Sequence, residues 1–275
     1  MKILVVPTDF SPVSINAMNY AVNMADAIGA NIMLVHIFQI PVSFNTDIYI
    51  PTISPDELQK INDERIQELK QKIEQTGSGK IKVYAEAKMG EIVDELNAIC
   101  KSINPFAIVM GTKGQSAVER LFLGSATLSA IRHLHAPIIV VPPGAEFKQI
   151  KKIGLACDFK QVVDTTPVSE IKELVQLFNA ELEVLNVDYK KKNSDSEKSE
   201  QSLLLDTLLE GTNPKYYFIN NAVVEDGINE FAESNAIDLL MVIPKKHRLL
   251  DGLFQKSHTS QLAFHSHIPI ISIHE

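Results

Sequence analysis

Three glycines in one loop have a spacing that could hold a phosphate group. Gly111, Gly114 and Gly124 follow the pattern G-x2-G-x9-G, and Ser125 comes directly after the last glycine. Glycine allows backbone N–H groups to turn toward one point and form a concave nest for anions. Gly124 and Ser125 also begin a predicted helix, whose unpaired N–H groups and dipole would add to the same site. Hydroxyl and cationic side chains of the loop could complete it: Thr112, Lys113, Ser116 and Arg120.

The same glycines have a second interpretation, in which they only form turns and start a helix. The chain has 12 glycines, and three of them fall at this spacing between a strand and a helix. That concentration favours the anion-binding interpretation. The loop is neither a Walker sequence nor a dinucleotide fingerprint, because it contains neither G-x4-G-K-[ST] nor G-x-G-x-x-G.

Strands and helices alternate in the sequence around this loop. Short apolar or alternating runs predict strands at 3–6, 32–37, 81–87, 106–110 and 138–141. Helices are predicted between them from the stripe of Ala17, Ala21, Met24 and Ile28, and from the capping box that begins at Ser54. This alternation predicts a parallel sheet with helices on both faces. The glycine loop then follows the fourth strand.

The chain contains two copies of this unit of alternating strands and helices. Residues 121–143 align without a gap on residues 253–275, with nine identical letters at a constant shift of 132 positions. Both copies also begin with an apolar run that ends in Asp-Phe, at Asp9 and at Asp158. Prolines 142 and 143 stop the last strand of the first copy. We therefore predict two domains, 1–145 and 149–275.

Composition narrows the class of protein. The chain has 275 residues, 45% of them hydrophobic, which suits about two globular domains. Its net charge of -8 argues against an extended basic surface that would bind nucleic acid or an anionic membrane. Two distant cysteines form neither a disulfide framework nor a zinc pattern, and no segment has the apolar length of a membrane span. Histidines such as His133 and His135 are two residues apart and would chelate poorly on a helix. We expect a cytoplasmic protein without a metal site.

The sequence MGTKGQSAVERLFLGSAT resembles the ATP-binding signature of the universal stress protein family, G-x2-G-x9-G-[ST]. The opening ILVVPTDFSPVSINAMNYAVNMA and the closing PIIVVP are also similar to the first and last elements of that family's domain. The resemblance covers both copies. It implies an α/β fold of two tandem doubly wound domains, each an open five-stranded parallel sheet of order 3-2-1-4-5 flanked by helices. It also implies that the two last strands pair within one chain, and that two chains could associate further.

The resemblance further implies a nucleotide site in the first domain, for ATP with or without Mg²⁺. Its adenosine contacts would come from Pro7, Thr8, Asp9 and His36, or from the backbone beside His36 at Val35. Its phosphate contacts would come from the loop residues Gly111, Thr112, Lys113, Gly114, Gly124 and Ser125. Asp9 has a second interpretation, as a carboxylate that caps the first helix near Ser11. The two roles are compatible.

The second copy departs from the signature where glycine matters. In the common register, Ile243, Lys246 and Lys256 replace the three glycines, and Ser257 remains. Side chains at these positions would block the close backbone approach that glycine permits. We predict that the second copy does not bind ATP in this way and serves as a structural partner in an intramolecular pseudo-dimer.

Three functions remain open on these grounds. The first is a stress-response regulator that binds an adenine nucleotide and acts on protein partners that the sequence does not name. The second is a slow ATPase, although P-T-D-F-S follows the first strand where an ATP-pyrophosphatase relative would have S-G-G-x-D-S. No catalytic base stands out, so no catalytic residues are assigned. The third is a nucleotide-free scaffold.

Overall fold

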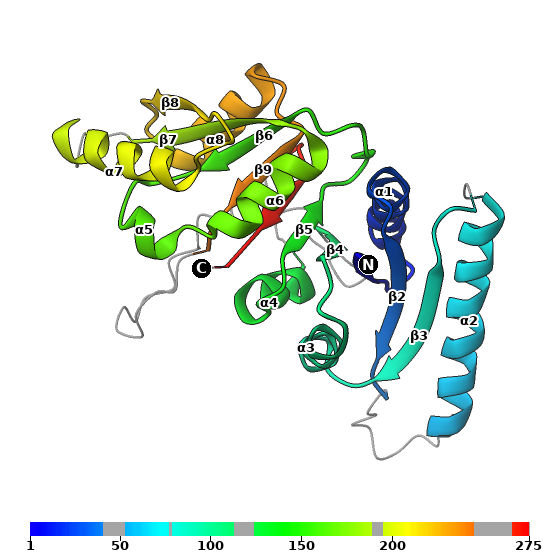
Figure 1. Ribbon diagram of the computed structural model, residues 1–275. Coiled ribbons are helices and arrows are strands. Elements are labelled where there is room, and N and C mark those ends of the chain that lie inside the picture. Colours follow the sequence, from blue (N-terminus) through cyan, green and yellow to red (C-terminus); the bar gives the residue numbers. More distant parts are fainter. Residues whose placement is uncertain (41–52, 77–78, 113–123, 189–194, 245–265, 275) are drawn as a thin grey trace, which may run out of the picture.

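The computed structural model describes residues 1–40, 53–76, 79–112, 124–188, 195–244 and 266–274 (Figure 1). The elements of the first half are β1 (Ile3–Pro7), α1 (Pro12–Ile28), β2 (Asn31–Phe38), α2 (Pro55–Thr76), β3 (Val83–Met89), α3 (Ile92–Ile103), β4 (Ala107–Gly111), α4 (Ser125–His133) and β5 (Ile138–Val141). Those of the second half are β6 (Lys152–Ala156), α5 (Val162–Thr165), α6 (Val168–Phe178), β7 (Glu181–Val187), α7 (Asp195–Leu208), β8 (Lys215–Ile219), α8 (Val224–Ser234), β9 (Leu239–Val242) and β10 (Ile270–Ser272).

All the described strands belong to one ten-stranded sheet, in the order β3-β2-β1-β4-β5-β10-β9-β6-β7-β8. Neighbouring strands within each half are parallel. The order β3-β2-β1-β4-β5 in the first half and β8-β7-β6-β9-β10 in the second confirms the predicted order 3-2-1-4-5 in both. The halves join where β5 and β10 pair antiparallel, with Ile139 opposite Ile271. Both strands are buried and contain paired isoleucines, and their pairing removes two exposed sheet edges. The predicted pairing of the last strands is therefore confirmed.

Helices cover both faces of the sheet (Figure 1). Helices α1, α2, α5, α6 and α7 pack their apolar residues on one face, and α3, α4 and α8 pack on the other. Alternate residues of a strand point to opposite faces, so both faces of these strands are apolar. In β1, for example, Leu4 and Val6 point to the α1 side and Val5 points to the α3 side.

Local sequence signals explain where α1 begins and ends. Ser11 is the N-cap, and its Oγ accepts a 3.2 Å hydrogen bond from the Ser14 N–H. Pro12 occupies the first turn, where its missing N–H is not needed. Gly29 ends the helix in the left-handed conformation, with a φ of 65°. These caps fix the start of α1 close to the carboxyl end of β1.

The second half differs from the first at the position of α1. The corresponding segment is divided into α5 and α6, because Pro167 holds Thr166 in an extended conformation, with φ −103° and ψ 116°. Helix α7 then packs on α5, whereas its counterpart α2 packs along β3. The two halves therefore share a sheet order but differ in their helix layer.

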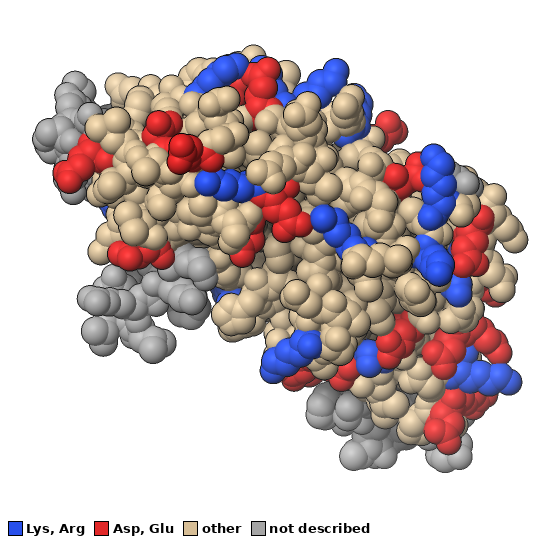
Figure 2. All heavy atoms as spheres, in the orientation of Figure 1, with Lys and Arg blue, Asp and Glu red and all other residues tan. Residues whose placement is uncertain are grey.

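The exterior carries both charges. On the face shown in Figure 2, lysine and arginine side chains lie interspersed with aspartate and glutamate and do not form one continuous basic surface. Among the helices that the structure describes, none has the length and apolar character needed to cross a membrane.

Candidate functional site

The turn from β1 to α1 is held by the side chains that the sequence singles out. The Asp9 Oδ1 accepts a 3.0 Å hydrogen bond from the Ser11 N–H, and Thr8 Oγ1 accepts one of 3.0 Å from the Phe10 N–H. Phe10 takes a φ of 61°, which is uncommon for a residue other than glycine. The residue that caps α1 is therefore Ser11, and the Asp9 carboxylate instead orders the backbone that leads into this N-cap.

His36 and Val35 lie at the end of β2 but face opposite sides of the sheet. The Thr8 N–H donates to the Val35 carbonyl oxygen over 2.9 Å, and His36 Nδ1 lies 2.8 Å from the Thr8 carbonyl oxygen. A carbonyl accepts hydrogen bonds, so His36 Nδ1 carries the proton. The His36 ring packs between Phe10 and Phe38, with centroid distances of 4.6 and 5.9 Å. The histidine therefore joins the ends of β1 and β2.

Ile37 is a further candidate that the sequence analysis does not single out. Val35 is 0% exposed as a whole residue, and its carbonyl oxygen already accepts a hydrogen bond from the Thr8 N–H. Ile37 is half-buried and packs with the same cluster as Val35. It lies two residues nearer the carboxyl end of β2, on the same face of the strand. The period of two along a strand is the signal that could have identified it.

Gly111 ends β4 where the strand passes under α1. A Cβ atom at this position would lie 2.5 Å from Val13 Cγ1 and 2.9 Å from the Val13 carbonyl oxygen. Glycine is thus required here by packing, whatever else the loop does. In the second half, the corresponding Ile243 is half-buried and packs on the core cluster that includes Val162.

The start of α4 is tied back to the end of β4. The Gly124 N–H donates a 2.6 Å hydrogen bond to the Thr112 carbonyl oxygen, and the Thr127 hydroxyl donates one of 2.8 Å to the Gly111 carbonyl oxygen. Within the described part of the chain, no side chain caps α4, and Ser125 is exposed in its first turn. An anion at this end would meet N–H groups that lack a helical partner. Lys113 and Gly114 lie outside the described residues.

The order of the strands brings the carboxyl ends of β1, β2 and β4 together at one edge of the sheet. Strand β1 lies between β2 and β4, and chain connections leave it in opposite directions at this point. Open α/β sheets bind ligands in the crevice at such a switch point, beyond the carboxyl ends of the strands. The described candidates at this edge are Pro7, Thr8, Asp9, Val35, His36, Gly111, Thr112, Gly124 and Ser125. Among the described residues, no three His, Cys, Asp or Glu side chains group as metal ligands.

The second half repeats the contacts at the end of its first strand. The Asp158 Oδ1 accepts a 3.1 Å hydrogen bond from the Lys160 N–H, and Phe159 takes a φ of 50°. Asn186 occupies the place of His36, and its Nδ2 donates over 2.8 Å to the Cys157 carbonyl oxygen. The half that lacks the glycine signature thus retains the same turn. These contacts belong to the fold, so the glycine loop and α4 carry the evidence for an anion site.

Tandem doubly wound α/β domains, joined through their last strands and with Gly111 and Gly124 beside one switch point, define the class of this protein. Residues 1–142 match the sequence profile of the universal stress protein family, and the chain belongs to that family. It is 29% identical over 145 residues to a universal stress protein of Methanocaldococcus jannaschii, a match that covers 51% of this chain and 81% of that protein.

Two solved structures share the fold of the whole chain. A universal stress protein of Archaeoglobus fulgidus superposes with a TM-score of 0.75 at 19% identity, covering 99% of this chain and 98% of that one. A functionally unknown protein of Pseudomonas aeruginosa superposes with a TM-score of 0.64 at 9% identity, covering 100% and 92%. The arrangement of both halves therefore recurs in these two proteins.

Proposed function

We propose that this protein is a cytoplasmic stress-response regulator that binds ATP or another adenine nucleotide in its first domain, 1–145. The second domain, 149–275, acts as its structural pseudo-dimer partner. Nucleotide occupancy would be read by protein partners through the shape of the crevice and the loops around it. The proposal rests on the glycine spacing and on the structure at the start of α4.

The observation that carries the proposal is the N-terminus of α4, which begins at a glycine N-cap beside the β1–β4 switch point. Its N-cap is Gly124, which has no side chain to accept from the first turn, and the Gly124–Thr112 hydrogen bond holds the helix start next to the end of β4. Phosphate oxygens would supply the missing acceptors and interact with the positive end of the helix dipole. A nucleotide with its phosphates here would place its remainder along the ends of β1 and β2.

The ligand contacts divide between two groups of residues. Phosphates would be held by Gly111, Thr112, Lys113, Gly114, Gly124 and Ser125. The adenosine would lie against Pro7, Thr8 and Asp9, with Ile37 and the backbone at Val35 beside it. His36 would act by fixing Thr8, since its ring already packs against two aromatic residues. A bound Mg²⁺ would neutralise phosphate charge. No residue is assigned to hydrolysis.

The experiment is to count nucleotides in the gently purified full chain, by denaturing it and separating the released small molecules by chromatography. We expect about one adenine nucleotide per chain. Gly114→Asp places a carboxylate in the predicted phosphate nest and should abolish the signal. The matched control is Lys246→Asp, at the same register position of the second copy, which should leave the count unchanged.

Other results would revise the proposal in specific ways. Two nucleotides per chain would show that the second domain also binds, against its lack of glycines. An empty protein that also fails to bind added ATP would overturn the proposal in favour of the nucleotide-free scaffold. Release of ADP from bound ATP over time would support the slow ATPase.

A further inference from the structure

The two edge strands of the sheet differ in how they are covered. Strands β3 and β8 stand at the two ends of the described strand order, so each has one side without a neighbouring strand. Such an edge carries backbone N–H and C=O groups that can pair with another chain, and native proteins usually block it. The first half blocks its edge with side chains, whereas the described residues of the second half do not.

Helix α2 lies along β3 and blocks the edge there (Figure 1). Gln67 Nε2 donates a 3.1 Å hydrogen bond to the Ala85 carbonyl oxygen. Gln59 Nε2 donates one of 3.0 Å to the Ala87 carbonyl oxygen. Both carbonyls lie on the open side of β3, because the alternate residues, up to Gly90 just after the strand, form the hydrogen bonds to β2. A further strand would have to displace these two side chains.

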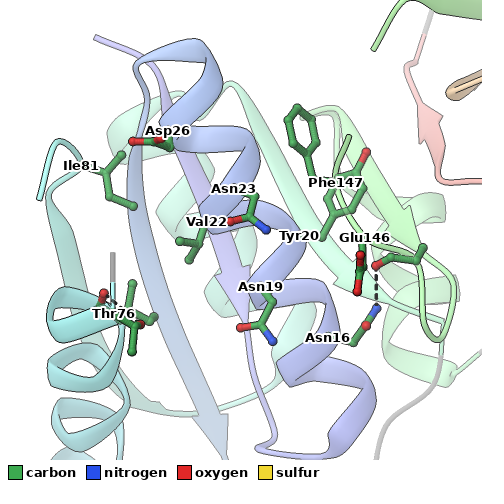
Figure 3. Close-up of a pocket in the computed structure, with 12 residues that line it drawn as sticks. Asn16, Asn19, Tyr20, Val22, Asn23, Asp26, Thr76, Ile81, Glu146 and Phe147 are labelled. Atoms are coloured by element: carbon green, nitrogen blue, oxygen red, sulfur yellow. Dashed lines mark hydrogen bonds between the residues drawn. The ribbon is translucent and has the colours of Figure 1, made fainter. Parts of the chain in front are cut away.

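The helix layers explain why only one edge is covered. In the first half, a cavity of about 480 Å³ lies between α1 and the end of α2, so α2 is not drawn onto α1 and stays over the edge strand (Figure 3). In the second half, α7 packs on α5 instead. A hydrogen bond of 3.4 Å joins Asp206 of α7 to the Tyr216 hydroxyl, at the tip of that side chain and not at the strand backbone.

The open side of β8 offers backbone groups and an aromatic ring. The Ile219 carbonyl oxygen accepts a 3.0 Å hydrogen bond from the Asp188 N–H, on the side of β7. The alternate residues Tyr216 and Phe218 therefore direct their N–H and C=O groups away from β7. Among the described residues, no hydrogen bond reaches these groups from the open side. The Phe218 side chain is 56% exposed, although its ring stacks on Phe159 with the centroids 5.5 Å apart.

Strand β8 is complementary to a second copy of itself. When two copies pair antiparallel about a two-fold axis at Tyr217, Tyr216 of each copy lies opposite Phe218 of the other. Both residues have outward backbone groups, so each such pair forms two hydrogen bonds. Their side chains share one face of the sheet, where opposed aromatic residues stabilise the pairing. Lys215 lies opposite Ile219, so no like charges within β8 face each other across the axis.

We propose that β8 joins two copies of this chain in a symmetric dimer with one continuous sheet. The join of β5 and β10 within the chain already pairs the edges of two such domains antiparallel. Leu203 of α7 lies one turn before Asp206 and is 67% exposed, and a second copy at this edge would cover it. Because the same strand serves both copies and β3 is blocked, association stops at two chains.

The test is sedimentation equilibrium of the full chain over a range of concentrations, with hydrogen exchange measured at the two extremes. We expect a reversible dimer, in which the Tyr216 and Phe218 amides exchange about tenfold more slowly than in the monomer. Phe218→Lys places two lysines diagonally on one face of the join and should weaken the dimer by about tenfold or more. Phe218→Pro removes an N–H that β7 does not use, and should weaken the dimer at least as much.

Two control variants separate the β8 edge from other surfaces. Tyr84 is a 49% exposed aromatic residue on the other edge strand, β3, so Tyr84→Lys should leave the dimer unchanged. Gly114→Asp should also leave it unchanged, which separates the join from the nucleotide site. Thermal unfolding shows that each variant is folded. The proposal is overturned if the chain stays monomeric, which would leave this edge to a strand of another protein, if the dimer persists in both Phe218 variants, or if Tyr84→Lys weakens it as much as Phe218→Lys.

Discussion

Gly111 at the end of β4 lies directly against Val13 in the first turn of α1, where a Cβ atom would be 2.5 Å from Val13 Cγ1. One of the three signature glycines is therefore explained by helix–strand packing alone. We expect Gly111→Ala to lower the free energy of unfolding by about 1–3 kcal/mol, the usual effect of overpacking a buried site. Urea denaturation of the nucleotide-free protein measures this.

The control for Gly111 is a second change in the same contact. Val13→Ala removes the closest atom but leaves the Val13 carbonyl oxygen, which would be 2.9 Å from the new Cβ. The double variant should therefore recover part of the stability that Gly111→Ala loses. Wild-type stability in Gly111→Ala would show that α1 can move away from β4 at little cost.

Asp9 and Asp158 make the same hydrogen bond in the two halves, each to the N–H two residues later, over 3.0 and 3.1 Å. We expect Asp9→Ala and Asp158→Ala each to lower the free energy of unfolding by about 1 kcal/mol, the usual contribution of one such hydrogen bond. The asparagine variants keep an acceptor oxygen and should stay close to wild type. Nucleotide binding should weaken in Asp9→Ala alone. Equal binding in both alanine variants would restrict Asp9 to its structural role.

Much of the fold was predictable because both copies combine short apolar strands with amphipathic helices. The strand order was implied by the resemblance to a family and is now confirmed in both halves. The division between α5 and α6 could also have been predicted, because Pro167 disfavours a helical conformation at Thr166. The alignment of the two copies does not reveal that this helix is divided in the second half, because it compares residue types and not backbone conformations.

The site was less predictable than the fold. The glycine spacing cannot distinguish a residue that approaches a ligand from one that approaches a helix, and Gly111 approaches Val13. Likewise, a histidine at a strand end can face a crevice or a neighbouring turn, and the ring of His36 packs against Phe10. The sequence shows which side chains of a strand alternate between the two faces of the sheet. Which of those faces lines the crevice depends on how the helices pack on the sheet.

Ser272 lies at the join of the two halves with a buried hydroxyl. It is opposite Ile138 in β5, it is 0% exposed, and its Oγ has no hydrogen-bond partner among the described residues. Ser272→Ala should raise the free energy of unfolding by about 1 kcal/mol, because a buried unpaired hydroxyl is unfavourable. Ser14→Ala is the matched comparison, since its buried hydroxyl contacts Thr8 Oγ1 and the Ser11 carbonyl oxygen. That variant should be destabilised, and the same sign for both would contradict the role assigned to the unpaired hydroxyl.

Glu181 and Lys215 pair on neighbouring strands β7 and β8. The Lys215 ammonium donates a hydrogen bond to Glu181, which lowers the pKa of that carboxyl, and Glu181 in turn raises the pKa of Lys215. Because the Glu181 pKa is lower in the folded state than in the unfolded state, the carboxylate stabilises the fold at pH values above its unfolded-state pKa. This contribution is lost as the pH falls through the folded-state pKa. The raised lysine pKa contributes stability that is lost as pH rises through its folded value. NMR titration of Lys215→Met should show the Glu181 pKa rising toward normal, and Lys60→Met, in the first domain, should leave it unchanged.

Thr127 links the start of α4 to the strand that precedes it. Its buried hydroxyl donates a 2.8 Å hydrogen bond to the Gly111 carbonyl oxygen. Thr127→Val keeps the shape of the side chain but leaves that carbonyl without this donor, so we expect a loss of about 1–2 kcal/mol in the free energy of unfolding. Because the hydrogen bond also positions the helix N-terminus, adenine nucleotide affinity should fall in Thr127→Val and return in Thr127→Ser. Affinity is measured in conditions where each variant is fully folded. Loss of stability with unchanged affinity would mean that α4 does not hold the phosphates.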